Sequence, residues 1–302
     1  MPATLPRKDQ TLEELLTVRD WVRFFVSEMN RHKVFLGHGS SHVLDEAIYL
    51  VQSALNLPIE DVSPYLDARV LRAEREQLNS YLTQRTEDRK PASYITGQAW
   101  LQGHAFKVDP RVIIPRSFIA EILADQITPW INDPDQPFRI LDLCTGSGCL
   151  AILAAMVFPH ASVDAVDLSP AALEVARENI ALHNMGDRVN AIESDLFDAL
   201  AGKQYDIIIT NPPYVNESSM KALPPEYLHE PRMALAGGDD GMRLIERIMA
   251  QAPAFLSEEG LLILELGNEK PYFDQAFPDL SPTWLETSAG DEQVFLMHQT
   301  DF

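Results

Sequence analysis

The tetrapeptide Asn211-Pro212-Pro213-Tyr214 carries the most specific chemistry in this sequence. It follows residues 205–210, a short and mainly β-branched run that indicates a buried parallel strand. Because two prolines cannot continue the hydrogen-bonded ladder, the strand must end there in a rigid turn. In an α/β sheet the carboxyl ends of the strands are where ligands bind, so we expect this turn to face a ligand.

The groups that this turn presents suit a planar –NH2 group. The Asn211 side chain and the proline carbonyls offer oxygens that can accept both N–H bonds, and the Tyr214 ring can stack on the flat face. The turn therefore predicts an enzyme that acts on an amide or on an exocyclic amine. The turn alone favours neither of these two substrates over the other.

Residues 140–148 form a second candidate site, because they read as a strand that runs into a glycine loop and then into a helix. Gly146 and Gly148 would let a ligand approach the backbone closely at a helix N-terminus. The loop alone also fits the dinucleotide fingerprint G-x-G-x-x-A. Asp142, inside the strand, favours S-adenosylmethionine over NAD, since a carboxylate can face a cationic sulfonium ligand but is unfavourable beside a pyrophosphate.

Acidic residues also end the next two expected strands. Asp167 lies twenty-five residues beyond Asp142, near the spacing at which an acid reaches ribose hydroxyls in such folds. Ser169 is the better candidate for capping the helix that follows, which leaves Asp167 for ribose. Asp195 could accept from an adenine amino group and Phe197 could cover the adenine ring, although a core phenylalanine is nearly as good an interpretation.

The charge of the chain is uneven. The net charge is −21 over 302 residues; residues 1–100 carry 12 Lys and Arg against 14 Asp and Glu, whereas residues 101–302 carry 12 against 31. An acidic surface repels phosphate backbones and attracts cationic partners. The charge therefore argues against direct nucleic-acid readout, although solubility alone would also explain it.

Neither a membrane segment nor a secretory signal is expected. No apolar run approaches the length of a membrane span and residues 1–8 lack the apolar stretch of a signal peptide, so we expect a cytoplasmic protein. Cys144 and Cys149 are the only cysteines, and they form no C-x-x-C pattern. No two histidines have the spacing of metal ligands, so we expect reduced thiols and no metal site.

The first part of the chain is expected to be helical. Thr11-Leu12-Glu13-Glu14 fits a capping box, which predicts that a helix begins there. Further helical patterns run through residues 42–56 and 67–86, and no alternating strand pattern separates them. From Ser93 to Pro115, glycines and prolines punctuate short apolar stretches, which indicates a β-hairpin linker.

From residue 116 onward, strands and helices alternate, which is typical of a mainly parallel sheet. We expect a first helix near 116–129 and a loop at 132–137. The expected strands are 139–144, 162–168, 189–194, 205–210 and 260–266, and the expected helices between them are 148–158, 170–183 and 241–256. Two further strands, 284–288 and 293–299, follow without a helix between them and predict an antiparallel pair that closes the sheet.

As an ordered set, these motifs resemble those of the HemK/Prm family of protein-glutamine methyltransferases. The matching motifs are residues 142–148, Asp167, residues 194–197 and residues 211–214, flanked by Val112–Arg116, His229–Pro231 and Ala234–Gly238. The match spans roughly residues 90–300. It is specific as a set, although each motif alone is not.

Within the family, residues 142–149 resemble the PrmB branch, which modifies the large-subunit ribosomal protein L-three. The branch that modifies peptide chain release factors usually has a glycine where Cys144 stands. It also has a further proline or glutamine and additional acids where Ser117 and Phe118 stand here. These differences favour the PrmB branch.

The resemblance implies an α/β fold of the class I S-adenosylmethionine-dependent methyltransferases, a Rossmann-like seven-stranded mixed sheet in the order 3-2-1-4-5-7-6 with a small N-terminal helical domain. We expect a helical substrate-recognition domain at 1–90, a β-hairpin linker at 91–115 and a catalytic domain at 116–302. The expected methyl donor is S-adenosyl-L-methionine and the product S-adenosyl-L-homocysteine.

The resemblance also implies roles for residues. Asn211 and the Pro212 carbonyl would hold the glutamine amide while its nitrogen attacks the methyl group, and Tyr214 completes the catalytic set. Pro213, Arg116 and His229 would add to the substrate site. The residues expected to bind the donor are Asp142, Cys144, Thr145, Gly146, Gly148, Asp167, Leu168, Asp195, Phe197 and Asn211.

Three alternatives stay open. One is a release-factor glutamine methyltransferase. Another is an adenine-amino DNA methyltransferase, because the same tetrapeptide can clamp a flipped base, but such an enzyme needs a basic channel that residues 101–302 do not offer. The last is a non-catalytic ribosome-assembly factor that binds a basic ribosomal protein, which would need neither the tetrapeptide nor the glycine loop.

Overall fold

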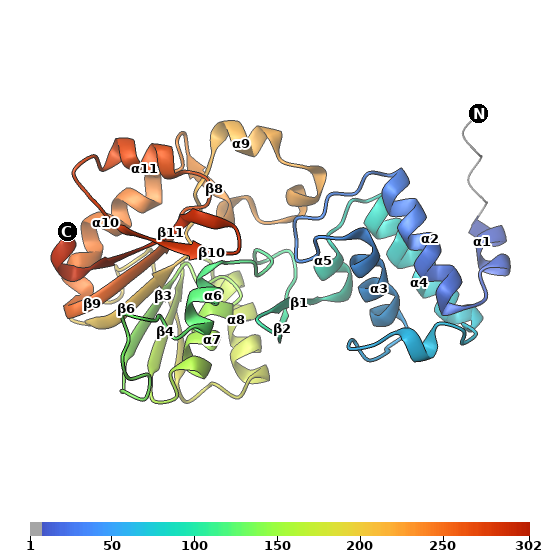
Figure 1. Cartoon of the computed structure of the whole chain (residues 1–302), viewed down its shortest axis with the longest axis horizontal. Coiled ribbons are helices and arrows are strands. Elements are labelled where there is room, and N and C mark those ends of the chain that lie inside the picture. Colours follow the sequence, from blue (N-terminus) through green and yellow to red (C-terminus); the bar gives the residue numbers. More distant parts are fainter. Residues whose placement is uncertain (1–7) are drawn as a thin grey trace. The chain divides into compact units, whose positions relative to one another are not determined.

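The computed structural model of the chain describes residues 8–302, which form two compact units (Figure 1). The first unit contains the residues up to Gln98 together with the segment Pro224–His229, and the second contains Ala99–Leu223 and Glu230–Phe302. Among the described residues, no helix is long and apolar enough to cross a bilayer.

The first unit is a helical bundle with its own apolar core. Its helices are α1 (Lys8–Glu14), α2 (Val18–Arg31), α3 (Val43–Ala54), α4 (Arg72–Thr86) and α5 (Ala92–Thr96), with 3-10 turns at Ser63–Tyr65 and Pro225–His229. The largest side chains of the core, among them Trp21, Phe25, Leu50 and Leu78, are completely buried. The helical pattern at 42–56 is confirmed as α3, and the pattern at 67–86 is confirmed as α4 from Arg72 onward, since residues 67–71 are not helical.

The prediction of a capping box at Thr11–Glu14 is wrong, because residues 8–14 already form α1 and Thr11 lies inside that helix. The capping box belongs to α2. The Asp20 amide donates to Thr17 Oγ1 at 3.2 Å, and the Thr17 amide donates to Asp20 Oδ2 at 2.9 Å. The same sequence pattern occurs at both places, and the break between α1 and α2 decides which one caps a helix.

The second unit is built on a seven-stranded sheet in the order β10-β11-β9-β6-β3-β4-β5. Its strands are β3 (Arg139–Leu143), β4 (Ser162–Asp167), β5 (Val189–Glu193), β6 (Tyr205–Thr210), β9 (Leu256–Glu265), β10 (Thr283–Thr287) and β11 (Gly290–His298). Six of the seven strands run in the same direction, and β11 runs antiparallel to both of its neighbours, β9 and β10. The α/β class, the order of the strands and the closing antiparallel pair are confirmed.

Helices cover both faces of this sheet (Figure 1). One face packs on α6 (Ile119–Ala124), α7 (Cys149–Val157) and α8 (Pro170–Leu182), and the other packs on α10 (Arg243–Phe255) and α11 (Lys270–Ala276). Side chains alternate between the two cores along each strand: Ile207 and Ile209 of β6 point to the first, and Ile208 points to the second. The expected helices 148–158, 170–183 and 241–256 are confirmed, whereas α6 is shorter than predicted and α11 was not predicted.

Two small sheets accompany the main one. β1 (Gln98–Leu101) and β2 (His104–Lys107) are joined by Gln102 and Gly103, both of which have positive φ, as a tight hairpin turn requires. β7 (Val215–Asn216) and β8 (Ala236–Gly238) pair in parallel directly after the Asn211–Tyr214 turn, with α9 (Glu217–Ala222) between them. The hairpin was predicted; the second pair was not.

Candidate active site

A pocket of about 730 Å³, counted out to its open mouth, lies at the carboxyl ends of four neighbouring strands of the second unit. The loops after β3, β4, β5 and β6 each contribute to its lining. The lining residues on these loops are Cys144, Gly146, Asp167, Leu168, Asp195, Leu196, Asn211 and Pro213. Its position is typical of a small-molecule site in an α/β sheet.

Asp142 holds the glycine loop in place from inside the protein. Its Oδ2 accepts hydrogen bonds from Thr145 Oγ1 at 2.5 Å and from the Ala151 amide at 3.0 Å. At Gly148, φ is +80° and an added Cβ would lie 3.2 Å from the Cβ of Ala176 on α8. Only glycine therefore lets the loop pass this close to the neighbouring helix while it enters α7.

The other oxygen of Asp142 is unusual. Oδ1 is buried and has no hydrogen-bond partner among the described residues, and burial raises the pKa of this carboxyl group to about 7. A buried carboxylate of this kind is stabilised by a nearby cation. Asp142 lies beneath the glycine loop and does not line the pocket itself, so its place in the donor site stays a prediction.

Asp167 lines the pocket and also organises the loops around it. Its Oδ1 accepts from the Ser169 amide at 2.8 Å, and its Oδ2 accepts from the Gly146 amide at 2.9 Å. Burial raises the pKa of Asp167. Ser169 Oγ accepts from the Ala172 amide and caps α8, as predicted, so the carboxylate is not needed as the cap.

The loop after β5 places its two candidate residues, Asp195 and Phe197, in different surroundings. Asp195 lines the pocket and forms an ion pair with Arg247 at 3.0 Å. Phe197 is buried and its ring stacks on Phe255 with centroids 4.6 Å apart, in the core that α10 covers. The ring of Phe197 packs in this core and does not line the pocket, whereas Leu196, with a φ of +50°, does; the assignment of Phe197 to the donor site stays a prediction.

The Asn211–Tyr214 turn ends β6 at the same pocket. Asn211 and Pro213 line it, and Asn211 is only half-buried, so its amide is accessible to a ligand. Both prolines are buried. Gly237 allows the turn to be this compact, since a Cβ there would lie 2.7 Å from the Tyr214 backbone. The structure thus brings the Asn211–Tyr214 turn together with the loops after β3, β4 and β5 at one pocket.

Arg116 and His229 have protein partners of their own. The Arg116 guanidinium forms a two-pronged ion pair with the buried Glu230, with both N–O distances at 2.8 Å. His229, in the first unit, has its Nε2 2.8 Å from the carbonyl oxygen of Asp88. The substrate-binding roles of both residues stay predictions.

Both cysteines are free thiols, and burial raises their pKa, to about 12 for Cys149. Such thiols are poor nucleophiles at neutral pH. Within residues 8–302, no three His, Cys, Asp or Glu side chains gather in a way that could hold a metal ion.

Several lining residues were missed from the sequence, chiefly Arg111, Ile113, Met233 and Ala234. They come from the segments just before α6 and just before β8, which lie far from the glycine loop in the chain. The flanking motifs at 112–116 and 234–238 could have indicated this part of the lining, because the family resemblance included both; it gave a role only to Arg116.

Comparison with known proteins agrees with this geometry. A family model described as the methyltransferase small domain matches residues 122–238. The solved structure of the hMettl16 catalytic domain in complex with MAT2A 3'UTR hairpin 1 aligns with a TM-score of 0.50 and 15% identity, over 83% of this chain and 89% of that chain. At that identity the likeness shows a shared fold alone.

Relatives of known sequence match nearly the whole chain. The ribosomal protein uL3 glutamine methyltransferase of Bordetella pertussis is 54% identical over 285 residues, which are 94% of this chain and 96% of the relative. The protein of that name from Burkholderia pseudomallei is 48% identical over 292 residues, covering 94% and 95% of the two chains. With its class I sheet, its glycine loop and its Asn-Pro-Pro-Tyr turn, the chain belongs to the family of ribosomal protein uL3 glutamine methyltransferases.

Proposed function

We propose that this protein transfers the methyl group of S-adenosyl-L-methionine to the side-chain amide nitrogen of a glutamine in the large-subunit ribosomal protein L-three (uL3), forming N5-methylglutamine. The observation that carries the proposal is the position of Asn211, which lines the same pocket as Gly146, Asp167 and Asp195. A receptor for a planar amide thereby stands beside a pocket suited to a cationic nucleoside.

Different residues around the pocket would contact different groups of the donor. The donor would supply an electrophilic methyl group on sulfur. Asp167 and Asp195 offer carboxylate oxygens to hydroxyl and amino groups, and Leu168 and Leu196 offer apolar walls. Asp142, buried beneath the glycine loop, supplies negative charge that complements a cation. The Gly146 backbone allows a close approach.

The Asn211–Tyr214 turn addresses the poor nucleophilicity of an amide nitrogen, whose lone pair is delocalised into its carbonyl group. Oxygens of Asn211 and Pro212 would accept hydrogen bonds that strengthen as the nitrogen becomes cationic, and the Tyr214 ring would fix the plane of the amide. Positioning of this kind can supply roughly 7–11 kcal/mol of the barrier. No side chain is required to act as a formal base.

The choice of a ribosomal protein as substrate is supported by the names of the relatives and by charge. Residues 101–302 are strongly acidic, and ribosomal proteins are basic, so the two surfaces attract each other. The same charge disfavours a DNA substrate. Since ribosomal proteins are synthesised and assembled in the cytoplasm, the proposal places the reaction there.

A labelling experiment tests the proposal. The protein is incubated with methyl-labelled S-adenosylmethionine and, in separate reactions, with purified uL3, with a peptide chain release factor and with adenine-containing duplex DNA. We expect label on uL3 above the other two, at a rate that falls with increasing salt because charge assists the encounter. Label on the release factor would show that release factors, and not uL3, are the substrate. Label on adenine would overturn the proposal.

A further inference from the structure

Glu265 is a buried acid that the proposed chemistry does not use. It is the last residue of β9 and is 2% exposed. Its Oε2 accepts hydrogen bonds from Ser117 Oγ at 2.6 Å and from the Phe118 amide at 2.8 Å. Its Oε1 lies 3.4 Å from the hydroxyl oxygen of Tyr214. One carboxylate thus joins the segment before α6 to the last residue of the amide-receiving turn.

The residues that follow Glu265 also contact this turn. Gly267 has a φ of +56°, and a Cβ there would come within 2.6 Å of the Tyr214 ring. Both carboxylate oxygens of Glu269 accept from Asn216 Nδ2, at 2.9 and 3.0 Å. The segment 265–269 therefore contacts the hydroxyl group and the ring of Tyr214, the last residue of the turn. It also binds the side chain of Asn216, two residues further along the chain.

A carboxylate at position 265 lowers the stability of the folded protein at neutral pH, because burial disfavours its charged form and raises the pKa of Glu265 to about 7. An apolar side chain would fill the same space without that cost. An acid is useful there because a carboxylate accepts several hydrogen bonds at once from separate parts of the chain. Its partners belong to two such parts, residues 117–118 and Tyr214.

We propose that Glu265 is a positioning residue that fixes the Tyr214 hydroxyl, and through it the Asn211–Tyr214 turn, in the geometry that receives the substrate amide. The inference rests on the proposed function of that turn. It assigns Glu265 no contact with the donor or with the reacting nitrogen.

A double-mutant cycle tests this link. Glu265→Ala is expected to lower kcat by about 10- to 100-fold, because small displacements in an active site have effects of that size. Glu265→Gln keeps an oxygen for Ser117 and a polar group for Tyr214, and should restore most of the loss. In a Tyr214→Phe background, Glu265→Ala should change kcat within about twofold, since residues that act through one contact are not additive. The affinity for S-adenosylmethionine should stay within about threefold in every variant.

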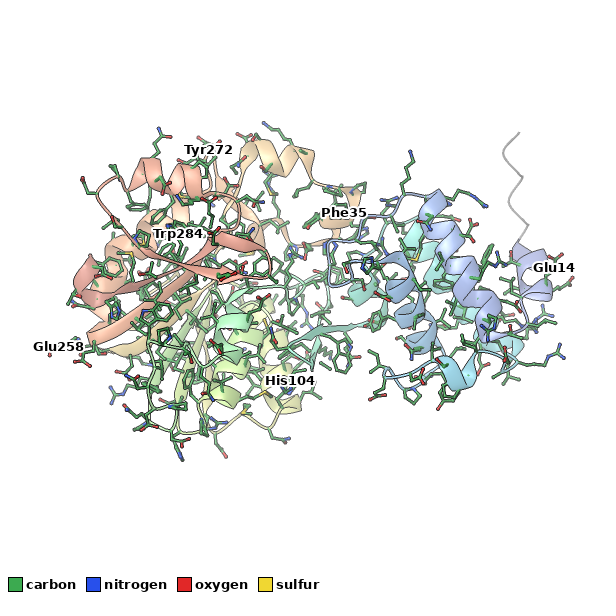
Figure 2. All side chains as sticks on the ribbon, in the orientation of Figure 1. Glu14, Phe35, His104, Glu258, Tyr272 and Trp284 are labelled. Atoms are coloured by element: carbon green, nitrogen blue, oxygen red, sulfur yellow. The ribbon has the colours of Figure 1, made fainter. Side chains whose placement is uncertain are left out.

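The matched control is Glu258→Ala. Glu258 lies near the other end of β9 and is exposed (Figure 2), so this change should leave kcat and KM within about twofold of wild type. If circular dichroism shows that Glu265→Ala does not fold, Glu265→Asp takes its place in the cycle, because the shorter acid withdraws from Tyr214. Equal effects of the position-265 change in both backgrounds, or a donor affinity weakened with kcat preserved, would overturn the proposal.

A second readout does not depend on turnover, so the two proposals can fail separately. Hydrogen exchange of the backbone amides of Asn211 and of residues 214–216 should be faster in Glu265→Ala than in wild type, while exchange in α7 should be unchanged. Unchanged exchange in the turn would contradict the positioning role even if wild-type protein methylated no glutamine. Absence of uL3 methylation with faster exchange would contradict only the proposed function.

Discussion

The backbone amide of Gly146 donates a hydrogen bond to Oδ2 of Asp167 at 2.9 Å. The glycine loop after β3 is thereby tied to the carboxyl end of β4, and the same carboxylate lines the pocket. One side chain both shapes the pocket and offers it a hydrogen-bond acceptor.

This dual role predicts that Asp167→Ala weakens the binding of S-adenosylmethionine by about 10- to 100-fold, because hydrogen bonds to a charged group contribute roughly 1.5–3 kcal/mol each. Isothermal titration calorimetry measures the affinity. Asp187→Ala, an exposed aspartate outside the pocket, is the matched control and should leave the affinity unchanged. Equal affinities for wild type and Asp167→Ala would exclude Asp167 from the donor site.

Asn211→Ala should distinguish the proposed role of Asn211 in receiving the substrate amide from a role in binding the donor. The variant should lose about 100- to 1,000-fold in turnover, the size expected when one group that stabilises the transition state is removed. Its affinity for S-adenosylmethionine should stay within about threefold, because the other lining residues are intact. Single-turnover kinetics and calorimetry measure the two quantities, and Asn190→Ala, which changes an exposed asparagine on the edge strand β5 outside the pocket, serves as control. Near-normal turnover in Asn211→Ala would contradict the receptor role.

The strands and helices of the second unit were predictable because their signals are local. A run such as residues 205–210 is apolar, β-branched and stopped by proline, and Ser169-Pro170 marks a helix start that the structure confirms. The order of the strands came from the family resemblance, since pairing between β3 and β6 joins residues far apart in the chain.

What the sequence did not predict depends on contacts between distant segments. Phe197 could have faced a ligand or the core, and only the position of Phe255 on α10 decides for the core. Pro224–His229 belongs to the first unit because the carboxylate of Glu226 binds Arg85, 141 residues earlier. No periodicity in a single sequence reports such pairs.

The ion pairs of Glu226 lead to a stability prediction. Glu226 is fully buried and contacts Arg85 at 3.2 Å and Arg89 at 2.7 Å, and Arg85 is itself 1% exposed. Arg85 also pairs with the buried Glu46 at 2.6 Å, so Glu226→Ala leaves one excess positive charge shared by Arg85 and Arg89. The change should lower the free energy of unfolding by about 3 kcal/mol, the lower end of the range for a broken buried ion pair.

Urea unfolding measures this difference, with Arg72→Ala as the comparison. Arg72 pairs with Glu76 on an exposed helix surface, so breaking that pair should change stability by less than about 1 kcal/mol. Similar small effects of both changes would contradict a structural role for the buried cluster.

Asp142 predicts a dependence of stability on pH. Burial raises its folded-state pKa from 3.8 to about 7, so between these pH values the folded protein holds a proton that the unfolded chain has released. The stabilisation is complete below the unfolded pKa and is lost as the pH rises to about 7. Asp142→Asn cannot titrate, so its stability relative to wild type should rise over that range, by about 4 kcal/mol at most.

Donor-free protein is the sample for this measurement, and thermal or urea unfolding at several pH values gives the difference. The exposed change Asp125→Asn should show no such trend. A difference between Asp142→Asn and wild type that stays flat from pH 4 to pH 7 would show that Asp142 keeps an ordinary pKa.

The central claim, that an amide nitrogen of a protein glutamine is the methyl acceptor, is tested most directly by the chemistry of the product. Wild-type protein methylates uL3 with labelled donor, the labelled residue is mapped by tandem mass spectrometry, and the labelled protein is then hydrolysed in acid. We predict label on a single glutamine, release of the label as methylamine, and loss of that signal with Asn211→Ala. Label that maps to lysine, arginine or a backbone position, or that releases no methylamine, would contradict the account.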